Sequence, residues 1–312
     1  MPMAGLNQNS REELERLCEQ QKIEVLWEEP MSRHTSFKIG GAAKAMCIPQ
    51  DRTQLAELMK FIRSRGLDSW FLGNGSNLLV SDDGLDGVVV LLSSDFDGEI
   101  VVEETTVQAP AGKKLSAVCS AACRAGLTGL EFAWGIPGSI GGAVYMNAGA
   151  YGGEMKDRLI WVEYLNRSGE VVRLSAQELR LSYRHSCFME PEYEGGCILR
   201  AAFTLNPGEQ AEIQQEMDRI IGQRQAKQPL EYPSAGSTFQ RPQGAYASQL
   251  IDQCGLRGRT VGGAQVSTKH AGFVINLGSA TCQDVLELVS QIKECVKEKT
   301  GYELELEVRR LP

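Results

Sequence analysis

The stretch Gly73-Asn74-Gly75-Ser76-Asn77-Leu78-Leu79-Val80 joins a run of small residues to an apolar segment. A similar run follows at Gly135-Ile136-Pro137-Gly138-Ser139-Ile140-Gly141-Gly142. Small residues let backbone N–H groups approach a ligand closely and donate to an anion, so two such loops indicate a site for one diphosphate-bearing cofactor. The alternative is a pair of tight turns in a β-rich domain. Neither run matches G-x-G-x-x-G or G-x-x-x-x-G-K-[ST], which argues against the Rossmann and P-loop classes of nucleotide binder.

Length, composition and charge limit the class of protein. With 312 residues the chain is long enough for two or three domains, each with its own core. The composition is 42% hydrophobic and 23% charged, which is typical of a soluble globular protein. The net charge of −8 argues against a nucleic-acid binder, which is normally basic, but it allows a locally basic pocket for an anionic substrate.

The sequence contains no signal for a membrane or for export. No window approaches the roughly 20 apolar residues of a membrane span, so we expect no membrane insertion. Residues 1–21 are polar and rich in Glu, unlike a secretory signal. The nine cysteines are scattered and never spaced C-x-x-C, which disfavours disulfides or a zinc site and favours reduced thiols in a cytosolic protein. With only three histidines, we expect no metal centre.

Hydrophobic periodicity predicts a mixed α+β chain. Apolar residues at helical spacing over 55–62 follow a capping Asp51 and precede Gly66, and with strands at 70–72, 78–80 and 88–92 they predict a β-α-β-β unit over residues 40–92. From 100 to 206 strands dominate, with helices near 114–125 and at 175–178, where Ser175 and Glu178 fit a capping box. The strands of this region are expected at 100–102, 107–109, 143–147, 159–165, 171–174 and 198–205.

The last third of the chain has a different pattern. Asn206-Pro207-Gly208 punctuates the sequence and predicts a domain boundary. Helices are expected from 213 to about 227, over a second segment that carries Leu250, Ile251 and Cys254 and stops at Gly255, and over 285–296 with Gly301 beyond the end. Residues 302–310 alternate as a strand, with Glu303, Glu305 and Glu307 on one face. Alternation favours a solvated face, whereas the alternative places Glu307 and Arg309 in a cleft.

Two further segments carry candidate chemistry. Arg184 lies in the run Tyr183-Arg184-His185-Ser186-Cys187-Phe188, and it suits either a surface ion pair or a clamp for a planar carboxylate. Ser237 lies in the turn-rich run 233–239 and by default caps a turn. Because the G-x-S-x-G frame is absent, hydrolase chemistry is poorly supported. The runs 262–264 and 267–273 suit either anion binding or turns that bound strands.

Taken together, these motifs resemble those of the UDP-N-acetylenolpyruvoylglucosamine reductase family. These are flavoenzymes that complete UDP-N-acetylmuramic acid in bacterial peptidoglycan synthesis. The motifs occur in the same order as in the family and cover roughly residues 33 to 310. They are the segments 33–41, 73–80, 126–132, 135–152, 183–188, 233–239, 255–273 and 307–309.

The resemblance implies an α+β protein of three domains, with an FAD-binding fold of the vanillyl-alcohol-oxidase (PCMH) type and a C-terminal α+β substrate domain. The implied domains are an N-terminal α/β FAD-binding subdomain at 1–93, a second α+β FAD-binding subdomain at 94–207 and a substrate-binding domain at 208–312. FAD would be held noncovalently. The implied cofactor contacts are Thr35, Gly73, Asn74, Gly75, Ser76, Asn77, Leu78, Gly138, Ser139, Gly142, Asn147 and Arg224.

The resemblance also implies an NADPH-dependent oxidoreductase that acts on a CH–CH group. NADPH would reduce the flavin, and hydride from flavin N5 would reduce an enolpyruvyl ether of UDP-N-acetylglucosamine. Arg184 would stabilise charge on the substrate carboxylate, Ser237 would protonate the carbanionic carbon, and Glu307 would act as an acid or orient one. The implied substrate contacts are Lys227, Arg241, Arg257, His270 and Arg309.

Some alternatives stay open at the level of sequence. The chain lacks a longer tyrosine-bearing loop of one family branch, so it resembles the shorter branch, in which the cover over the substrate is undefined. The rival functions are a flavin oxidase or dehydrogenase on the same fold with another substrate, and a noncatalytic nucleotide-sugar binder. The expected partner is a small nucleotide sugar rather than a nucleic acid, and the expected location is the cytoplasm.

Overall fold

A computed structural model describes residues 5–312 of the chain, and the first four residues of the predicted polar N-terminal segment lie outside this range. The chain forms two compact units. The N-terminal unit comprises the residues up to Trp27 together with Lys44–Asn74 and Asp86–Gly222. The C-terminal unit comprises Glu28–Ala43, Gly75–Leu85 and Gln223–Pro312. The three predicted domains, with boundaries at 93/94 and 207/208, stay a prediction.

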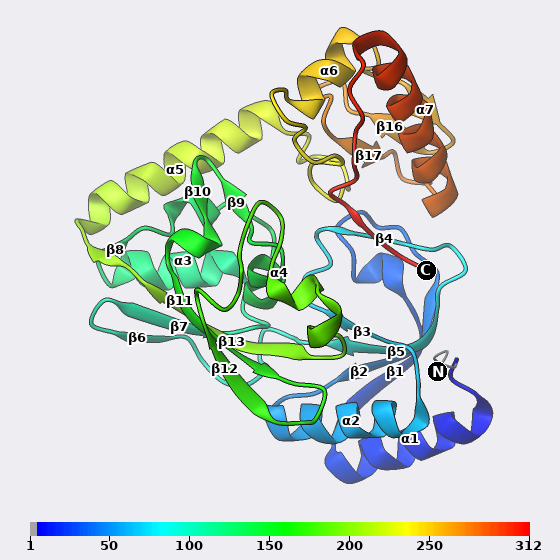
Figure 1. Ribbon diagram of the computed structural model, residues 1–312, viewed down its shortest axis with the longest axis vertical. Helices are drawn as coiled ribbons and strands as arrows, with labels where there is room; N and C mark the ends of the chain where they lie inside the picture. The colour runs from blue at the N-terminus through cyan, green and yellow to red at the C-terminus, as the bar shows by residue number, and fades with distance from the viewer. Residues whose placement is uncertain (1–4) are drawn as a thin grey trace. The chain divides into compact units, whose positions relative to one another are not determined.

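A four-stranded sheet opens the structure, with strands in the order β1 (Glu24–Pro30), β2 (Ala42–Ile48), β5 (Leu85–Leu91) and β3 (Ser69–Leu72). Helices α1 (Gln8–Gln21) and α2 (Arg52–Arg65) lie side by side against it (Figure 1). The prediction for α2 is confirmed, because Asp51 caps its first amides and Gly66, at φ +60°, ends it.

The N-terminal unit also contains a five-stranded antiparallel sheet. Its order is β12 (Val171–Ser175), β11 (Leu159–Leu165), β13 (Cys197–Thr204), β7 (Thr106–Pro110) and β6 (Val101–Glu103). One buried cluster runs through the unit and includes Val88 and Val90 of β5, Val107 of β7 and Val118 of α3 (Leu115–Arg124). Both sheets of this unit therefore share one hydrophobic core, which fixes the loops that leave their strand ends.

Short elements complete the N-terminal unit. β8 (Leu127–Thr128) pairs with β14 (Asn206–Pro207), β9 (Gly149–Ala150) pairs with β10 (Gly153–Glu154), and α4 spans Ile140–Tyr145. Helix α5 (Gln210–Lys227) begins in this unit and ends in the C-terminal one. The 3₁₀ turns of this unit are η2 (Glu131–Ala133), η3 (Met155–Asp157), η4 (Cys187–Met189) and η5 (Pro191–Tyr193), whereas η1 (Met31–Arg33) belongs to the C-terminal unit.

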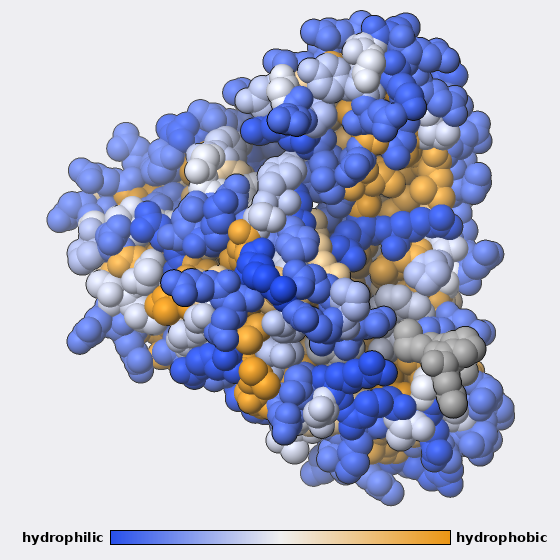
Figure 2. All heavy atoms as spheres, viewed as in Figure 1, coloured by the Kyte–Doolittle hydropathy of each residue, from blue (hydrophilic) through white to orange (hydrophobic). Residues whose placement is uncertain are grey.

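The C-terminal unit has its own core. A three-stranded sheet, β15 (Thr260–Val261), β16 (Ala264–Val266) and β17 (Val274–Asn276), packs with α6 (Ala247–Gln253) and α7 (Cys282–Thr300). The predicted apolar face of α7 is confirmed, since the residues at helical spacing are all buried, namely Val285, Leu288, Val289, Ile292 and Val296. β4 (Leu78–Val80) and β18 (Arg309–Leu311) form a separate parallel pair. Figure 2 shows a largely hydrophilic face, with a group of hydrophobic residues beside α7.

Three local predictions are wrong. Residues 143–147 are not a strand, because Ser139 caps α4 and buried Ile140, Ala143 and Val144 recur at helical spacing. The capping box at Ser175 and Glu178 forms, with 2.8 Å from the Ser175 amide to Glu178 Oε2, yet residues 176–180 make only a turn. That turn ends at Arg180, whose φ of +48° stops helical propagation.

The third of these predictions concerns the C-terminal segment, which is not one continuous strand. Only β18 is extended in a ladder, and Leu306 forms an isolated bridge with Phe239. The predicted alternation is nevertheless confirmed, because Leu304 and Val308 are buried while Glu305 is exposed. The segment therefore follows the C-terminal core without a long partner strand.

None of the helices between residues 5 and 312 combines the length and the apolar character that a membrane span requires. The cysteines are all free thiols, and each is buried except the half-buried Cys295. Burial raises the pKa of the Cys119 thiol to about 12 and that of Cys187 to about 11. Such thiols are protonated at neutral pH and are poor nucleophiles.

Candidate active site

The first glycine loop follows β3 and leads into β4. Gly75 has φ +57°, and a Cβ placed on it would lie 2.0 Å from the carbonyl oxygen of His34. The Ser36 amide donates to the Gly75 carbonyl oxygen at 3.2 Å. Thr35 is buried beside this contact, and its hydroxyl donates to the Ile39 carbonyl at 3.1 Å. Glycine is therefore required at position 75 so that the 34–36 segment can pack against the loop.

The two glycine loops contact each other inside the N-terminal unit. A Cβ on Gly73 would lie 2.1 Å from Ser139 Oγ, and Asn74 Nδ2 donates to the Pro137 carbonyl at 3.2 Å. Ser139 is buried, and its hydroxyl accepts from the Gly142 amide at 3.4 Å. The structure therefore brings the Gly73 and Asn74 part of the first run beside the Pro137 and Ser139 part of the second, while their joint role in binding a cofactor stays a prediction.

Both loops fit a diphosphate-bearing cofactor. Gly73, Asn74, Ser76 and Asn77 are partly exposed, so a ligand can reach their backbone. Gly142 is exposed, and a Cβ built on it meets nothing closer than Ser139 Oγ at 3.5 Å. Small residues with accessible backbone N–H groups are the donors that bind phosphate oxygens in many nucleotide sites.

Arg184 lies at the tip of a tight turn in the N-terminal unit. It is half-buried, its Nη2 atom lies 3.4 Å from the Gly149 carbonyl oxygen, and its guanidinium lies 5.0 Å from the centre of the Tyr183 ring. Asn147, a predicted cofactor contact, is fully buried nearby. Its side-chain amide donates to the Ser182 carbonyl at 2.9 Å, so in this structure Asn147 supports the turn that carries Arg184.

Ser237 and Glu307 lie on adjacent segments of the C-terminal unit. The Glu307 amide donates to the Thr238 carbonyl at 2.9 Å, and Phe239 forms a bridge with Leu306. Ser237 is exposed and Glu307 is half-buried. The structure therefore brings together the segments that carry two of the three predicted catalytic residues, which are 70 positions apart in the sequence.

The first glycine loop is hydrogen-bonded to the segment that carries Glu307. Asn77 Nδ2 donates to the Glu307 carbonyl at 3.1 Å, and the Arg309 amide donates to the Asn77 carbonyl at 2.9 Å. Directly beyond these bonds, β4 and β18 pair in parallel. The loop that is predicted to hold FAD and the segment that carries Glu307, which leads into β18, are therefore held in a fixed register.

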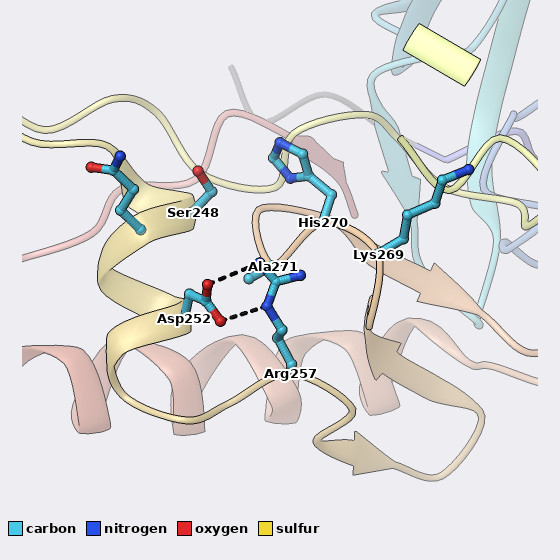
Figure 3. A pocket seen from close by; sticks show the side chains of 7 residues that line it. Ser248, Asp252, Arg257, Lys269, His270 and Ala271 are labelled. Carbon is cyan, nitrogen blue, oxygen red and sulfur yellow. Dashed lines mark hydrogen bonds and ion pairs between the residues drawn. The ribbon is translucent and has the colours of Figure 1, made fainter. Parts of the chain in front are cut away.

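A pocket of about 100 Å³ forms between α6 and the loop before β17 (Figure 3). Arg257 Nη2 donates to Asp252 Oδ2 at 2.9 Å, and Arg257 Nη1 donates to the Thr268 carbonyl at 2.9 Å. The ion pair raises the pKa of Arg257, mainly through the hydrogen bond to Asp252. The residues that line the pocket are Ser248, Gln249, Asp252, Arg257, Lys269, His270 and Ala271.

His270 is a neutral donor in this pocket at pH 7. Its Nδ1 accepts from the Gly272 amide at 3.1 Å, which leaves the proton of the neutral ring on Nε2. Burial lowers the pKa of His270 below its ordinary value, and the positive charge of Arg257 lowers this pKa further. The structure thus brings together Arg257 and His270, two of the predicted substrate contacts.

The other predicted contacts lie elsewhere in the C-terminal unit. Arg224 lies in the last turn of α5 and Lys227 is the exposed final residue of that helix. The Arg241 guanidinium stacks 4.5 Å from the centre of the Tyr246 ring, and Arg309 begins β18.

The site predicted from the sequence omits two residues that lie next to predicted site residues in the structure. Lys269 lines the pocket, and its Nζ donates to the Gln225 carbonyl at 2.7 Å. The sequence could have indicated Lys269 because it lies in the run 267–273, which suits anion binding. Glu154 accepts a hydrogen bond from Asn147 at 2.8 Å, and no sequence pattern marked it because its partner is seven residues away in a loop.

Comparison with known proteins first identifies the general class to which this chain belongs. The sequence profile described as "FAD binding domain" matches residues 43–175, a range that contains both glycine loops. The chain is therefore an FAD-binding flavoprotein, and the predicted α+β fold with a flavin-binding domain of the vanillyl-alcohol-oxidase type is confirmed.

The chain belongs to the UDP-N-acetylenolpyruvoylglucosamine reductase family. The profile of the C-terminal domain of that reductase matches residues 228–311. The reductase of Caldanaerobacter subterraneus is 50% identical over 281 residues, which is 90% of this chain and 91% of that protein. The reductase of Lachnoclostridium phytofermentans is 47% identical over 288 residues, covering 91% and 92%.

A solved relative agrees with this assignment. The crystal structure of UDP-N-acetylenolpyruvylglucosamine reductase from Thermus caldophilus matches with a TM-score of 0.77 at 36% identity. The match covers 93% of this chain and 99% of that one. Members of the family are FAD-dependent oxidoreductases that act on a CH–CH group in peptidoglycan synthesis, as the sequence motifs predict.

Proposed function

We propose that this chain uses noncovalently bound FAD and NADPH to reduce UDP-N-acetylglucosamine enolpyruvate to UDP-N-acetylmuramate in the cytoplasm. The observation that carries the proposal is the meeting of the first glycine loop, the Ser237 segment and Glu307. The hydrogen bonds that join Asn77, Glu307 and Thr238 support a site in which a hydroxyl and a carboxylate would act beside a loop suited to a flavin cofactor.

The chain has the donors that FAD requires. Backbone groups of residues 73–78 and of Gly138, Ser139 and Gly142 would hold its diphosphate, with Thr35 and Arg224 as further contacts. Asn147, whose buried amide is bonded to Ser182, Glu154 and Lys156, would support the site without a cofactor contact of its own. When bound, FAD supplies the hydride carrier between NADPH and the substrate. A side chain at Gly73 would clash with Ser139 and one at Gly75 with His34, so glycine keeps the first loop in this conformation.

Arg184 suits the substrate carboxylate. An enol ether conjugated to a carboxylate is electron-rich and accepts hydride poorly. A guanidinium paired with that carboxylate withdraws electron density and stabilises the negative charge that develops on its oxygens. The planar fork of Arg184 matches a carboxylate in two hydrogen bonds, which lysine does not reproduce.

Ser237 suits the proton that completes the reaction. Its exposed hydroxyl would donate a proton to the carbanionic carbon that remains after hydride addition. A serine hydroxyl is a weak acid, so this role depends on a strongly basic acceptor. The carboxylate of Glu307, on the adjacent segment, would act as an acid or orient the donor.

The Arg257 pocket suits an anionic part of the nucleotide sugar. Its volume of about 100 Å³ is below the roughly 300 to 1,000 Å³ of pockets that enclose a whole ligand, so it would take one part only. Arg257, His270 and Lys269 supply the donors there. Lys227, Arg241 and Arg309 would contact other parts of the substrate.

One experiment tests the proposal. The purified protein should show a flavin spectrum that bleaches when NADPH is added without oxygen and returns when the enolpyruvyl sugar is added. Return with oxygen but not with the sugar would favour a flavin oxidase. A colourless protein that binds the UDP sugar would favour a noncatalytic binder. Either result would refute the proposal.

A further inference from the structure

Arg184 is held in a conformation that arginine rarely adopts. Ser182 and His185 exchange both backbone hydrogen bonds, each 3.1 Å, so Tyr183 and Arg184 form a two-residue turn. The φ of Arg184 is +54°, a value that favours glycine because a Cβ is crowded there. A strained residue persists only where its surroundings hold it in place.

Asn147 holds the base of this turn. Its Nδ2 donates to the Ser182 carbonyl at 2.9 Å and to Glu154 Oε2 at 2.8 Å. Its Oδ1 accepts from the Lys156 amide at 3.0 Å. Asn147 is fully buried, so water cannot replace these bonds, and Glu154 is the only side chain among the three partners.

Glu154 is also fixed to the carbonyl that faces Arg184. In the β9–β10 hairpin it pairs with Gly149, whose carbonyl oxygen lies 3.4 Å from Arg184 Nη2. A Cβ on Gly149 would lie 2.7 Å from Glu154 Cγ, so glycine at 149 leaves room for the glutamate. The hydrogen bond to Lys156, followed by the bond to Asn147 and the charge of Arg184, lowers the pKa of Glu154.

We propose that Glu154 is a positioning residue for Arg184. Its carboxylate orients the Asn147 amide, the amide fixes the Ser182 carbonyl, and the turn then directs the guanidinium. This inference rests on the proposed function of Arg184 at the substrate carboxylate. It adds a residue with no substrate contact of its own to the groups on which reduction of the substrate depends.

Two variants separate the effect of side-chain length from the effect of charge at position 154. Glu154→Gln keeps the length of the side chain and an oxygen that accepts from Asn147, but it removes the charge. Glu154→Asp keeps the charge and can still cap η3, but it is one methylene shorter and cannot reach Asn147 without a shift. If Glu154 acts by orientation, Gln should be the better replacement.

The measurements are the two half-reactions of the FAD-loaded protein, each followed by stopped-flow absorbance without oxygen. Flavin reduction by NADPH should stay close to the wild-type rate in both variants. Reoxidation by the enolpyruvyl sugar should stay close to the wild-type rate in Glu154→Gln and fall roughly 10- to 100-fold in Glu154→Asp, the cost typical of losing a partner behind a functional group. Lys156→Gln, which removes only the ion pair to Glu154, should leave both rates unchanged.

The outcomes are distinguishable. Wild-type flavin that the sugar fails to reoxidise refutes the proposed function, and the positioning role falls with it. If wild-type protein turns over but Glu154→Gln reoxidises no faster than Glu154→Asp, the positioning role is refuted and the proposed function stands. Equal losses in both half-reactions would likewise indicate a purely structural residue.

Discussion

The backbone amide of Glu307 donates a 2.9 Å hydrogen bond to the carbonyl of Thr238, the residue directly after Ser237. The same Glu307 accepts from Asn77 of the first glycine loop through its own carbonyl. These hydrogen bonds fix the distance between the segments that carry Ser237 and Glu307. Substrate binding therefore does not have to bring these two segments together. Three variants test this arrangement, and a fourth tests the Arg257 pocket.

Ser237→Ala should separate the two half-reactions. The variant loses the proton donor, so flavin reoxidation by the enolpyruvyl sugar should slow by roughly 10²- to 10⁴-fold, while NADPH still reduces the flavin normally. Stopped-flow absorbance without oxygen measures both rates. Ser290→Ala, on the exposed face of α7, is the matched control and should change neither rate. Equal losses in both half-reactions would contradict the role of Ser237.

Glu307→Gln tests this carboxylate against another glutamate of the same C-terminal segment. Loss of the acid should slow reoxidation by about 10²-fold or more, with the fold intact because the backbone bonds to Thr238 and Asn77 remain. Glu305→Gln makes the same chemical change two residues away at an exposed position, and it should turn over normally. Similar rates for the two variants would restore the interpretation of a simple solvated face.

Gly75→Ala tests whether the first loop requires glycine. Both the positive φ and the contact with the His34 carbonyl oppose a side chain, so we expect a loss of roughly 2 kcal/mol or more in the free energy of unfolding, together with reduced flavin content. Urea titration and the flavin absorbance of the purified protein measure these effects.

Gly222→Ala is the control for this substitution. Gly222 lies within α5, is exposed, and has no atom within 4 Å of the added Cβ. Alanine there should therefore stabilise the helix by about 0.5 to 1 kcal/mol. If both alanine variants changed stability in the same direction, the argument from the loop geometry would be wrong.

Most regular elements were predictable from the sequence because their periodicity is local. The four apolar residues of α2 and the five of α7 lie on single helix faces with recognisable caps. The strand prediction at 143–147 failed because Ala143 and Val144 suit either structure, and the cap at Ser139 decided for a helix. In such a short apolar segment, hydrophobic periodicity does not distinguish a helix from a strand.

The candidate site was predictable only in part, because its contacts are not local. Residue types alone could mark Ser237 and Glu307, but their proximity depends on a pairing between segments far apart in the chain. The strain at Arg184 left no trace in the sequence, since no pattern predicts a positive φ for arginine. The Asn147–Glu154 bond was equally hidden, since it forms across a hairpin of two-residue strands.

His270→Gln should change how stability depends on pH. Burial holds the pKa of His270 below its ordinary value, so the unfolded chain takes up this proton more readily than the folded one. The neutral ring therefore contributes stability above pH 6.5, the pKa of an unperturbed histidine, and this contribution is lost as the pH falls toward the lowered pKa of the folded state. Urea titrations of the FAD-loaded wild type and variant at pH 7.5 and pH 5.5 measure it. The wild type should lose more stability than the variant between these values, and an equal or smaller loss would show that His270 is not held neutral by its pocket.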